Sequence, residues 1–474
     1  MSLFLPLTNN MFLKSCVKLS KELLEKYSVN IPRYTSYPTA PEWTEEFKEV
    51  DFLKAANNAN DIKSPVSLYF HLPFCESQCY FCGCNVVISK KKDITSPYLE
   101  HIKKEIINLG RLINKERTVE QIHLGGGTPT FFSPHEIADF YKTVRDNFNI
   151  SDSCEAGIEV DPRVTSPEHI ETLSKLGFNR ISMGIQDFNP VVQSAINRIQ
   201  SYEDTEKLIS HSRIKGFKSV NIDLIYGLPF QTKETFAETI DSILKLNPDR
   251  IALFHYAHLP QMIHHQGKYI SEDSLPQAEE KIRIFQYSVD RLAENGYVFI
   301  GLDHFAKPDD ELAVAKKNKT LHRNFQGYTT KSDCDLYGLG ITAISNVQNT
   351  YSQNIKKLNP YYEAVGLNNL PVFRGISLNK DDILRKEIIM KILCHGRVIK
   401  SEFEKKYNIN FDKYFSYEME ALKELEDDEL VLLNPNIEVT NLGQFFLRNI
   451  ACIFDHYLQK QKKDGKQKKY SKAV

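Results

Sequence analysis

Strand-like apolar runs alternate with helical patterns along the chain from about residue 66 to residue 300. We expect strands at 66–70, 120–124, 155–160, 179–185, 218–227, 250–256 and 296–302. The stretches between them have the length and periodicity of helices. Strands that alternate with helices in this way predict parallel βα units with right-handed crossovers.

Local signals mark where the intervening helices begin and end. Ser133 and Glu136 are expected to form a capping box at the start of a helix, with proline at the first helical position. Ser166 is expected to begin the next helix and Gly177 to end it, and Thr232 and Gly216 are expected to play matching roles further along the chain. A doubly wound sheet and a barrel both contain such units. We favour an α/β, TIM-barrel-like (βα) catalytic domain, open or closed, because residues of unusual chemistry follow many different strands.

The regions outside this pattern predict smaller attachments. Residues 1–60 are expected to form an N-terminal arm with a short helix, and residues 61–376 the barrel. Residues 377–459 predict a mostly helical C-terminal domain, and the lysine-rich residues 460–474 a disordered tail. Residues 431–450 would suit a hairpin and helix of a winged-helix module, but acidic residues crowd 418–429. A structural domain is therefore favoured over a DNA-binding one.

Charge and hydropathy exclude several classes of protein. The 474 residues carry a formal charge of -1, but the last fifteen hold seven lysines and one acidic residue. The rest of the chain has 53 basic and 60 acidic residues, a net charge of -7, so we expect no nucleic-acid partner. The first ten residues lack the features of a signal peptide, and no run of about 18 apolar residues predicts a membrane span.

The nine cysteines point to the chemistry. Their number is odd, four crowd between Cys75 and Cys84, and the other five are scattered. This is not the disulfide framework of a small secreted protein, so we expect reduced cysteines in the cytoplasm.

The four clustered cysteines form a C-x3-C-x2-C-x-C array directly after the first expected strand. A structural zinc site would need four ligands, and Cys84 or His71 would complete one with the first three cysteines. An ordinary [4Fe–4S] electron carrier also uses four cysteines, normally at other spacings. The spacing of Cys75, Cys79 and Cys82 is that of radical S-adenosylmethionine (SAM) enzymes. In that class three cysteines hold a [4Fe–4S] cluster and the fourth iron stays open for SAM. Electron transfer from the cluster then cleaves SAM to a radical that abstracts hydrogen from an unactivated carbon.

A wider set of motifs surrounds the cysteine array. It comprises PRYTSYPTA, LYFHLPFCESQCYFCGCN, HLGGGTPT, SMGIQDF, NIDLIYGLP, YAHLP, LDHFAKPDDELAVA and LHRNFQGYTT. These stretches run in one order from about residue 32 to residue 346, and together they resemble the oxygen-independent coproporphyrinogen III oxidase (dehydrogenase) family of haem biosynthesis, with weaker similarity to about 455. The resemblance implies a TIM-barrel-like fold with its active site at the carboxyl ends of the strands.

The resemblance also implies two SAM molecules and the residues that contact them. The expected contacts of the first SAM are Tyr69, Gly126, Glu159 and Ile344. Those of the second are Phe81, Gly127, Thr128, Gln186, Arg198, Asp223 and Ala257. Apart from the family, the glycines would be read as a tight turn, and the acidic and amide residues as solvated or capping groups.

The positions of five of these residues provide an independent check. Gly126, Glu159, Gln186, Asp223 and Ala257 fall at or just beyond the ends of successive expected strands. A parallel barrel places its active site at that end of its strands.

The implied reaction is the oxidative decarboxylation of two propionates of coproporphyrinogen III to vinyl groups, which gives protoporphyrinogen IX. The implied partners are this substrate and a low-potential electron donor such as a flavodoxin or ferredoxin system, with the protein a monomer. Arg33 and Arg323 are candidate partners of the substrate carboxylates, although each taken alone also reads as a surface arginine. A radical SAM-type haem chaperone without decarboxylase activity is the alternative function.

Overall fold

The computed structural model describes residues 19–465, 470 and 472, and its main feature is one twelve-stranded mixed sheet. The strand order is β16-β15-β14-β13-β1-β4-β5-β6-β7-β8-β10-β9. Neighbours from β13 to β8 are parallel. These strands are β13 (Asp335–Leu339), β1 (Val66–Leu72), β4 (Thr118–Gly126), β5 (Asn149–Val160), β6 (Arg180–Gln186), β7 (Ser219–Tyr226) and β8 (Arg250–His255). The first six expected strands are therefore confirmed.

The seventh expected strand does not extend the parallel ladder. β9 (Val298–Gly301) pairs antiparallel with β10 (His304–Ala306), which lies between β9 and β8. The two strands are joined by Leu302 and Asp303, and Leu302 has a φ of 51°, as a tight reversal requires. A two-residue turn leaves no room for a crossover helix, so the chain folds back and inserts β10 instead.

Short antiparallel strands extend the other side of the sheet. They are β14 (Ile344–Val347), β15 (Thr350–Asn354) and β16 (Val372–Ser377). In the strand order β16 and β9 stand at opposite edges, so the sheet is an open barrel within the described residues. Two further pairs lie outside this sheet, β2 (Phe74–Cys75) with β3 (Val87–Ile88) and β11 (His322–Asn324) with β12 (Gly327–Thr329).

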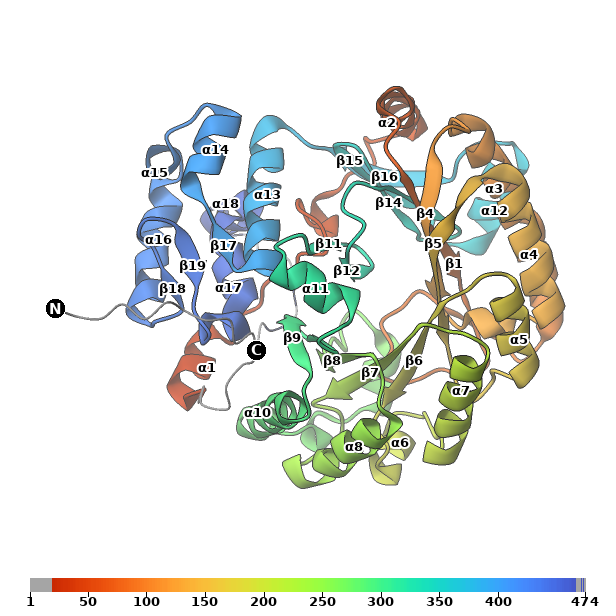
Figure 1. The fold of residues 1–474 in the computed structure, drawn as a ribbon, viewed down its shortest axis with the longest axis horizontal. Helices are drawn as coiled ribbons and strands as arrows, with labels where there is room; N and C mark the ends of the chain where they lie inside the picture. Colours follow the sequence, from red (N-terminus) through yellow and green to blue (C-terminus); the bar gives the residue numbers. More distant parts are fainter. Residues whose placement is uncertain (1–18, 466–469, 471, 473–474) are drawn as a thin grey trace.

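Helices cover the outer face of the sheet, as Figure 1 shows for the arc from α3 to α10. They are α3 (Thr95–Leu112), α4 (Pro134–Asn147), α5 (Pro167–Lys175), α6 (Pro190–Ala195), α7 (Tyr202–Ile214), α8 (Lys233–Leu246) and α10 (Ala278–Glu294). Ser133, Ser166 and Thr232 cap α4, α5 and α8 as expected, and Gly177 and Gly216 follow α5 and α7 with φ of 93°. The apolar faces of α3, α4, α5, α8 and α10 and the strands form the main core.

The N-terminal arm divides between two cores. α1 (Lys21–Tyr27) and Tyr34 pack with the C-terminal helices in a second core, and Figure 1 shows α1 beside them. α2 (Glu49–Ile62) packs its buried face on the barrel core and runs past the expected boundary at residue 60. Arm residue Thr44 forms a β-bridge with Gly375 of β16. The arm therefore contacts both larger parts of the protein.

The C-terminal region is mostly helical. Its helices are α13 (Lys380–His395), α14 (Lys400–Tyr407), α15 (Phe411–Tyr414), α16 (Ser416–Asp427), α17 (Leu447–Ala451) and α18 (His456–Lys463). A small sheet of β17 (Arg397–Val398), β19 (Ile437–Val439) and β18 (Val431–Leu432) includes the expected hairpin. The expected disordered tail needs a correction, because α18 continues to Lys463 with Leu458 and Gln461 buried. Residues 466–469, 471, 473 and 474 of that tail, and residues 1–18 of the arm, lie outside the described residues.

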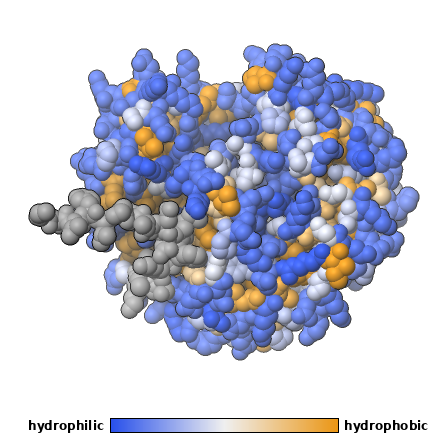
Figure 2. Space-filling model, in the orientation of Figure 1, coloured by the Kyte–Doolittle hydropathy of each residue, from blue (hydrophilic) through white to orange (hydrophobic). Residues whose placement is uncertain are grey.

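Three short helices complete the connections, α9 (His264–Tyr269), α11 (Glu311–Lys317) and α12 (Leu358–Gly366). The face in Figure 2 is mainly hydrophilic, and its hydrophobic residues are scattered, which is usual for a protein surface. Among the described residues no helix is both long and apolar enough to span a membrane.

Candidate active site

A cavity of about 360 Å³ opens at the carboxyl ends of the parallel strands. Eleven of the fourteen residues that the sequence singles out line it together. These are Cys75, Cys79, Phe81, Cys82, Gly126, Gly127, Thr128, Glu159, Gln186, Arg198 and Asp223. Ten of them come from the carboxyl-terminal parts of β4, β5, β6 and β7, from the turn after β4 or from the loop after β1, and Arg198 follows α6, so the expected convergence at this rim is found.

Backbone hydrogen bonds hold the cysteine loop on the rim. Residues Phe74 and Cys75 form β2, which pairs with β3 at the far end of the loop. The amides of Gly127 and Thr128 donate to the carbonyls of Leu72 and Phe74, at 2.9 Å each. The loop is thereby fastened to the end of β4, and its thiols face the same cavity as the glycines.

Each cysteine of the loop has a different polar environment. The Sγ of Cys75 lies 3.4 Å from the hydroxyl of Thr128, and burial raises the pKa of this thiol to about 11. The Sγ of Cys79 accepts hydrogen bonds from Arg163 and Arg198, each at 3.5 Å. A hydrogen bond from Cys84 lowers the pKa of Cys82 to about 7 despite its burial. Since metal ligation requires thiolates, contacts that stabilise negative sulfur prepare the loop for it.

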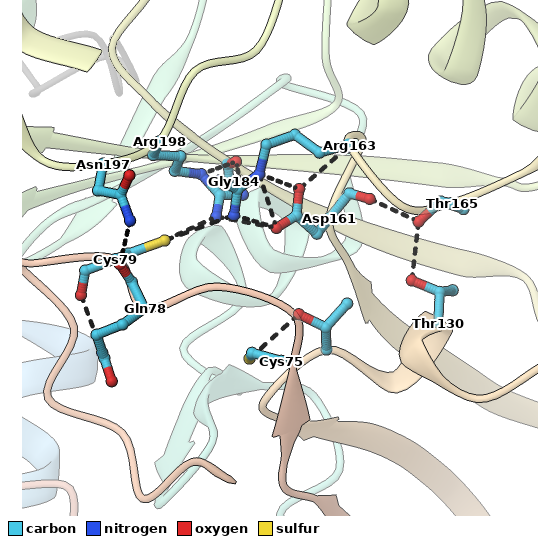
Figure 3. A network of polar contacts seen from close by, with 11 residues as sticks. Cys75, Gln78, Cys79, Thr130, Asp161, Arg163, Thr165, Gly184, Asn197 and Arg198 are labelled. Atoms are coloured by element: carbon cyan, nitrogen blue, oxygen red, sulfur yellow. Dashed lines mark hydrogen bonds and ion pairs between the residues drawn. The ribbon is translucent and has the colours of Figure 1, made fainter. Parts of the chain in front are cut away.

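Asp161 fixes the two arginines that face Cys79, as Figure 3 shows. Its carboxylate accepts from Arg163 at 2.7 Å and from Arg198 at 3.2 Å. Burial opposes ionisation, but the guanidinium charges outweigh it and lower the pKa of Asp161. Arg198 also donates to the carbonyl of Gly184 at 2.6 Å. The result is a partly buried pair of cations held rigidly against one thiol.

The triple glycine is required by close packing. A side chain at Gly125 would meet the carboxylate of Glu159 at 2.8 Å, and one at Gly127 would meet backbone atoms of Pro73 at 2.6 Å. Gly126 has a φ of 109°, and a side chain there would meet the ring of His71 at 2.6 Å. Glycine is the residue that adopts this conformation without strain, so the turn brings bare backbone to the cavity wall.

Glu159 is held in position by groups on β4. The amide of Gly126 donates to its Oε2 at 3.2 Å, and the Nε2 of His123 lies 3.2 Å from its Oε1. Burial would raise its pKa, but these interactions hold the pKa below the usual value, so the carboxylate is charged. The ring of Tyr69 stacks on that of His123 with centroids 6.0 Å apart. Tyr69 therefore supports the cavity wall through His123 rather than lining the cavity.

Asp223 and Gln186 face the cavity from β7 and β6. Burial, followed by repulsion from Glu159, raises the pKa of Asp223 to about 6. The amide of Asn221 donates to its Oδ1 at 2.8 Å. Gln186 is 7% exposed and has a φ of 67°, and its Oε1 is buried with no hydrogen-bond partner among the described residues. A buried amide oxygen left unpaired is costly, and a bound donor group in the cavity would satisfy it.

Ala257 and Ile344 are not brought to this cavity. Ala257 lies beyond β8 and lines a separate depression with His255 and His258. Ile344 is buried with Trp43 and Tyr351 in a small apolar cluster. Their contacts with SAM stay predictions.

Sequence reasoning missed part of the cavity lining, above all Asp161, Arg163, Ser182 and Gly184. Asp161 and Arg163 come directly after β5, so the rule that finds residues at strand ends also reaches them. No pattern in the sequence points to Gly184. Glycine is needed there because a side chain would lie 2.6 Å from the Nε2 of Gln186.

The donor set fits an iron–sulfur cluster better than a single metal ion. Among the described residues no three histidine, cysteine or acidic side chains converge closely enough to hold one ion. A zinc site needs its ligands around a single point. In a four-iron cluster each cysteine binds its own iron, so the thiols stand farther apart. Three thiols on one cavity wall, with an unpaired buried amide oxygen nearby, match a cluster and a polar ligand.

Comparison with known proteins places the chain in a family. The model of the Radical SAM superfamily matches residues 69–243. The oxygen-independent coproporphyrinogen III oxidase of Synechocystis sp. is 46% identical over 463 residues, which cover 97% of this chain and 98% of that protein. The protein of the same name from Escherichia coli K12 is 44% identical over 440 residues, 93% of this chain and 95% of that one.

A solved structure agrees with this relationship. Coproporphyrinogen III oxidase (HemN) from Escherichia coli, described as a radical SAM enzyme, superposes with a TM-score of 0.87 at 44% identity. The superposition covers 90% of this chain and 98% of that one. Fold, cavity and sequence agree, and the chain belongs to the oxygen-independent coproporphyrinogen III oxidase family of radical SAM enzymes.

Proposed function

We propose that this protein catalyses the oxygen-independent conversion of coproporphyrinogen III to protoporphyrinogen IX in haem biosynthesis. The observation that carries the proposal is the cavity in which the three thiols and eight further family positions meet. The chain is 44–46% identical, over nearly its whole length, to relatives named for this activity, which supports the same substrate. Two propionates lose carbon dioxide, one hydrogen atom and one electron each, and become vinyl groups.

Cys75, Cys79 and Cys82 are the proposed ligands of a [4Fe–4S] cluster, and two SAM molecules occupy the cavity beside it. When bound, the reduced cluster supplies the electron that cleaves SAM and so starts hydrogen abstraction from the substrate. Arg163 and Arg198 donate hydrogen bonds to the sulfur of Cys79. Such bonds stabilise negative charge on sulfur and tune the reduction potential of the cluster.

The remaining rim residues bind and orient SAM. Charged Glu159 accepts hydrogen bonds from hydroxyls of the first SAM, and the bare backbone at Gly126 allows that ligand to approach. Gln186 and Asp223 contact the second SAM, which gives the unpaired Oε1 of Gln186 a donor. Tyr69, Phe81, Gly127, Thr128, Arg198, Ala257 and Ile344 complete the proposed contacts.

Partners and setting are further parts of the proposal. A low-potential donor such as a flavodoxin or ferredoxin system supplies electrons, and the protein acts as a monomer. The eight cysteines among the described residues are free thiols, which supports a reducing cytoplasmic setting. No nucleic acid is a partner. We also propose a division into an arm that ends with α2 at Ile62, a barrel that continues to residue 376, and a C-terminal domain from 377 through α18 to Lys463.

Anaerobic reconstitution with iron and sulfide tests the function. The reduced protein should release 5′-deoxyadenosine from SAM only when coproporphyrinogen III is added. Cys75→Ala should abolish this release and lower the bound iron, whereas Cys334→Ala, at a half-buried cysteine outside the cavity, should retain both. Tight haem binding without substrate-dependent SAM cleavage would favour a haem chaperone instead. One equivalent of zinc without iron or sulfide would contradict both functions.

A further inference from the structure

A second, smaller cavity lies on the same rim as the cysteine cavity. It has a volume of about 50 Å³ and is lined by Tyr226 and His255, the last residues of β7 and β8. Arg33 of the arm, Arg323 of β11 and Arg448 of α17 also line it. Three guanidinium groups from distant parts of the sequence therefore meet at the carboxyl end of the barrel.

Arg33 is fixed without a close ionic partner. Its Nη2 donates to the carbonyl of His255 at 3.1 Å, and its guanidinium lies 6.0 Å from the ring centre of Phe254. Its Nη1 lies 3.9 Å from the Oδ2 of Asp303, which is too long for a hydrogen bond. The fork of Arg33 is thus held in place with hydrogen-bonding capacity left over.

Arg323 is less satisfied still. Its Nε and Nη1 are buried and have no hydrogen-bond partner within the described residues. The guanidinium lies over the ring of Tyr328 at 4.9 Å, so the side chain is packed rather than free to turn toward solvent. Nε and Nη1 lie on different edges of the guanidinium, so a bound carboxylate would pair with one of them and use Nη2 as its second donor.

Among the residues that the structure describes, one carboxylate lines this cavity, that of Asp303. Although buried, it is kept ionised by His304, Arg33 and Arg323, which lower its pKa to about 2. Its Oδ1 is already 2.7 Å from the Nδ1 of His304. One negative charge thus faces three guanidinium groups.

The remaining lining, which is partly apolar, adds no negative charge. Arg448 donates to the carbonyls of Pro32 at 3.1 Å and of Ile31, which joins the C-terminal region to the arm just before Arg33. Burial and the neighbouring cations lower the pKa of His255 to about 3, so its ring is neutral near pH 7. The Nε2 of His255 is also buried, and it has no hydrogen-bond partner in the described part of the chain.

We propose that this cavity is a carboxylate subsite, in which Arg33 and Arg323 bind a propionate of the substrate. The inference rests on the proposed function, because that function supplies a tetracarboxylate. The cavity has room for little more than one small group, since a water molecule takes up about 30 Å³ in the liquid. It therefore suits the end of a propionate, while the macrocycle extends toward the cysteine cavity along the rim.

Binding measurements with the reconstituted protein test the subsite. The probes are coproporphyrin III, the stable oxidised tetracarboxylate, and its tetramethyl ester, which carries no negative charge. Arg323→Gln should weaken binding of the acid about 10- to 100-fold and leave binding of the ester unchanged, because a charge-assisted contact is lost. Arg33→Gln should act in the same direction. Arg145→Gln, at an exposed arginine on α4, is the matched control and should change neither.

The same variants separate the subsite from the function as a whole. In turnover of coproporphyrinogen III, Arg323→Gln should raise KM with little change in kcat, while iron content stays at the wild-type level. Arg323→Lys keeps the charge but loses the planar fork, and should fall between wild type and Arg323→Gln. If Arg323→Gln does not fold, Arg323→Lys provides the same test of KM and of binding.

Three results would overturn the inference. If the wild-type enzyme is active and the Arg323 variants keep its KM and its affinity for the acid, the subsite is refuted and the proposed function is not. An equal loss of acid and ester binding would mean that the arginine acts on shape rather than on charge. Wild-type protein that neither binds coproporphyrin III nor turns over coproporphyrinogen III would refute the proposed function, and the subsite with it.

Discussion

Asp223→Asn should make the protein more stable above neutral pH while weakening its binding of SAM. In the folded protein the pKa of Asp223 is raised from 3.8 to about 6, first by burial and then by the charge of Glu159. Ionisation of this carboxyl therefore favours the unfolded state, where nothing opposes it. The stability it contributes is present below about pH 4 and is lost as the pH rises through about 6.

The size of the effect follows from the shift. About two pKa units correspond to at most about 3 kcal/mol once Asp223 is fully ionised. About half of that, roughly 1.5 kcal/mol, is expected to be lost between pH 5 and pH 8. Asparagine keeps an oxygen to accept the hydrogen bond from Asn221, so the variant changes the charge and little else.

Urea unfolding of the cluster-free protein at pH 5 and pH 8 measures this effect. The free energy of unfolding of the wild type should fall more between pH 5 and pH 8 than that of Asp223→Asn, and the variant should be the more stable protein at pH 8. Glu159→Gln should recover part of the gain, because it removes the repelling charge. Asp152→Asn, at an exposed position in β5, is the control and should follow the wild type. Parallel pH profiles for wild type and Asp223→Asn would refute the reasoning.

Three other substitutions test separate contacts. Asp161→Asn leaves two partly buried guanidiniums without their carboxylate, so it should cost about 2–4 kcal/mol of stability, measured by denaturant titration, and reduce the iron retained on gel filtration. Gly127→Ala places a methyl group 2.6 Å from the backbone of Pro73, so it should lower the free energy of unfolding by about 1–3 kcal/mol and reduce the iron loading. Gly366→Ala, whose methyl group would stand in open space, is the control and should load iron normally. Arg117→Met removes a fully buried cation from its ion pair and should lower the unfolding free energy by about 3–5 kcal/mol; wild-type stability would contradict that pairing.

Local pattern was sufficient for the part of the fold that follows one repeating rule. The six strands from β1 to β8 that the periodicity predicts are present, as are the caps at Ser133, Ser166 and Thr232. The expectation that β9 would be parallel is wrong, because the apolar run at 296–302 indicates a buried strand but not the direction of the strand that pairs with it. The direction is decided by a two-residue turn that inserts a three-residue strand, too short to show periodicity.

The site divides in the same way. Cysteine spacing and position at strand ends support seven of the eleven expected residues that meet in one cavity, and the family resemblance adds Phe81, Gly127, Thr128 and Arg198. The ion pair of Asp161 with Arg198 and the unpaired donors of Arg323 depend on segments far apart in the sequence, and no local pattern indicates them. Arg33 and Arg323 each read as surface arginines until the fold places them in one cavity with Asp303.

The most direct measurement of the central claim is the product formed from coproporphyrinogen III with labelled propionate carboxyls. Reconstituted, reduced protein and SAM are incubated without oxygen, and the carbon dioxide and the porphyrin products are identified by mass spectrometry. The account predicts two labelled carbon dioxide molecules for each protoporphyrinogen IX, and none from Cys75→Ala. Cleavage of SAM without loss of any carboxyl group, or decarboxylation that persists in Cys75→Ala, would contradict it.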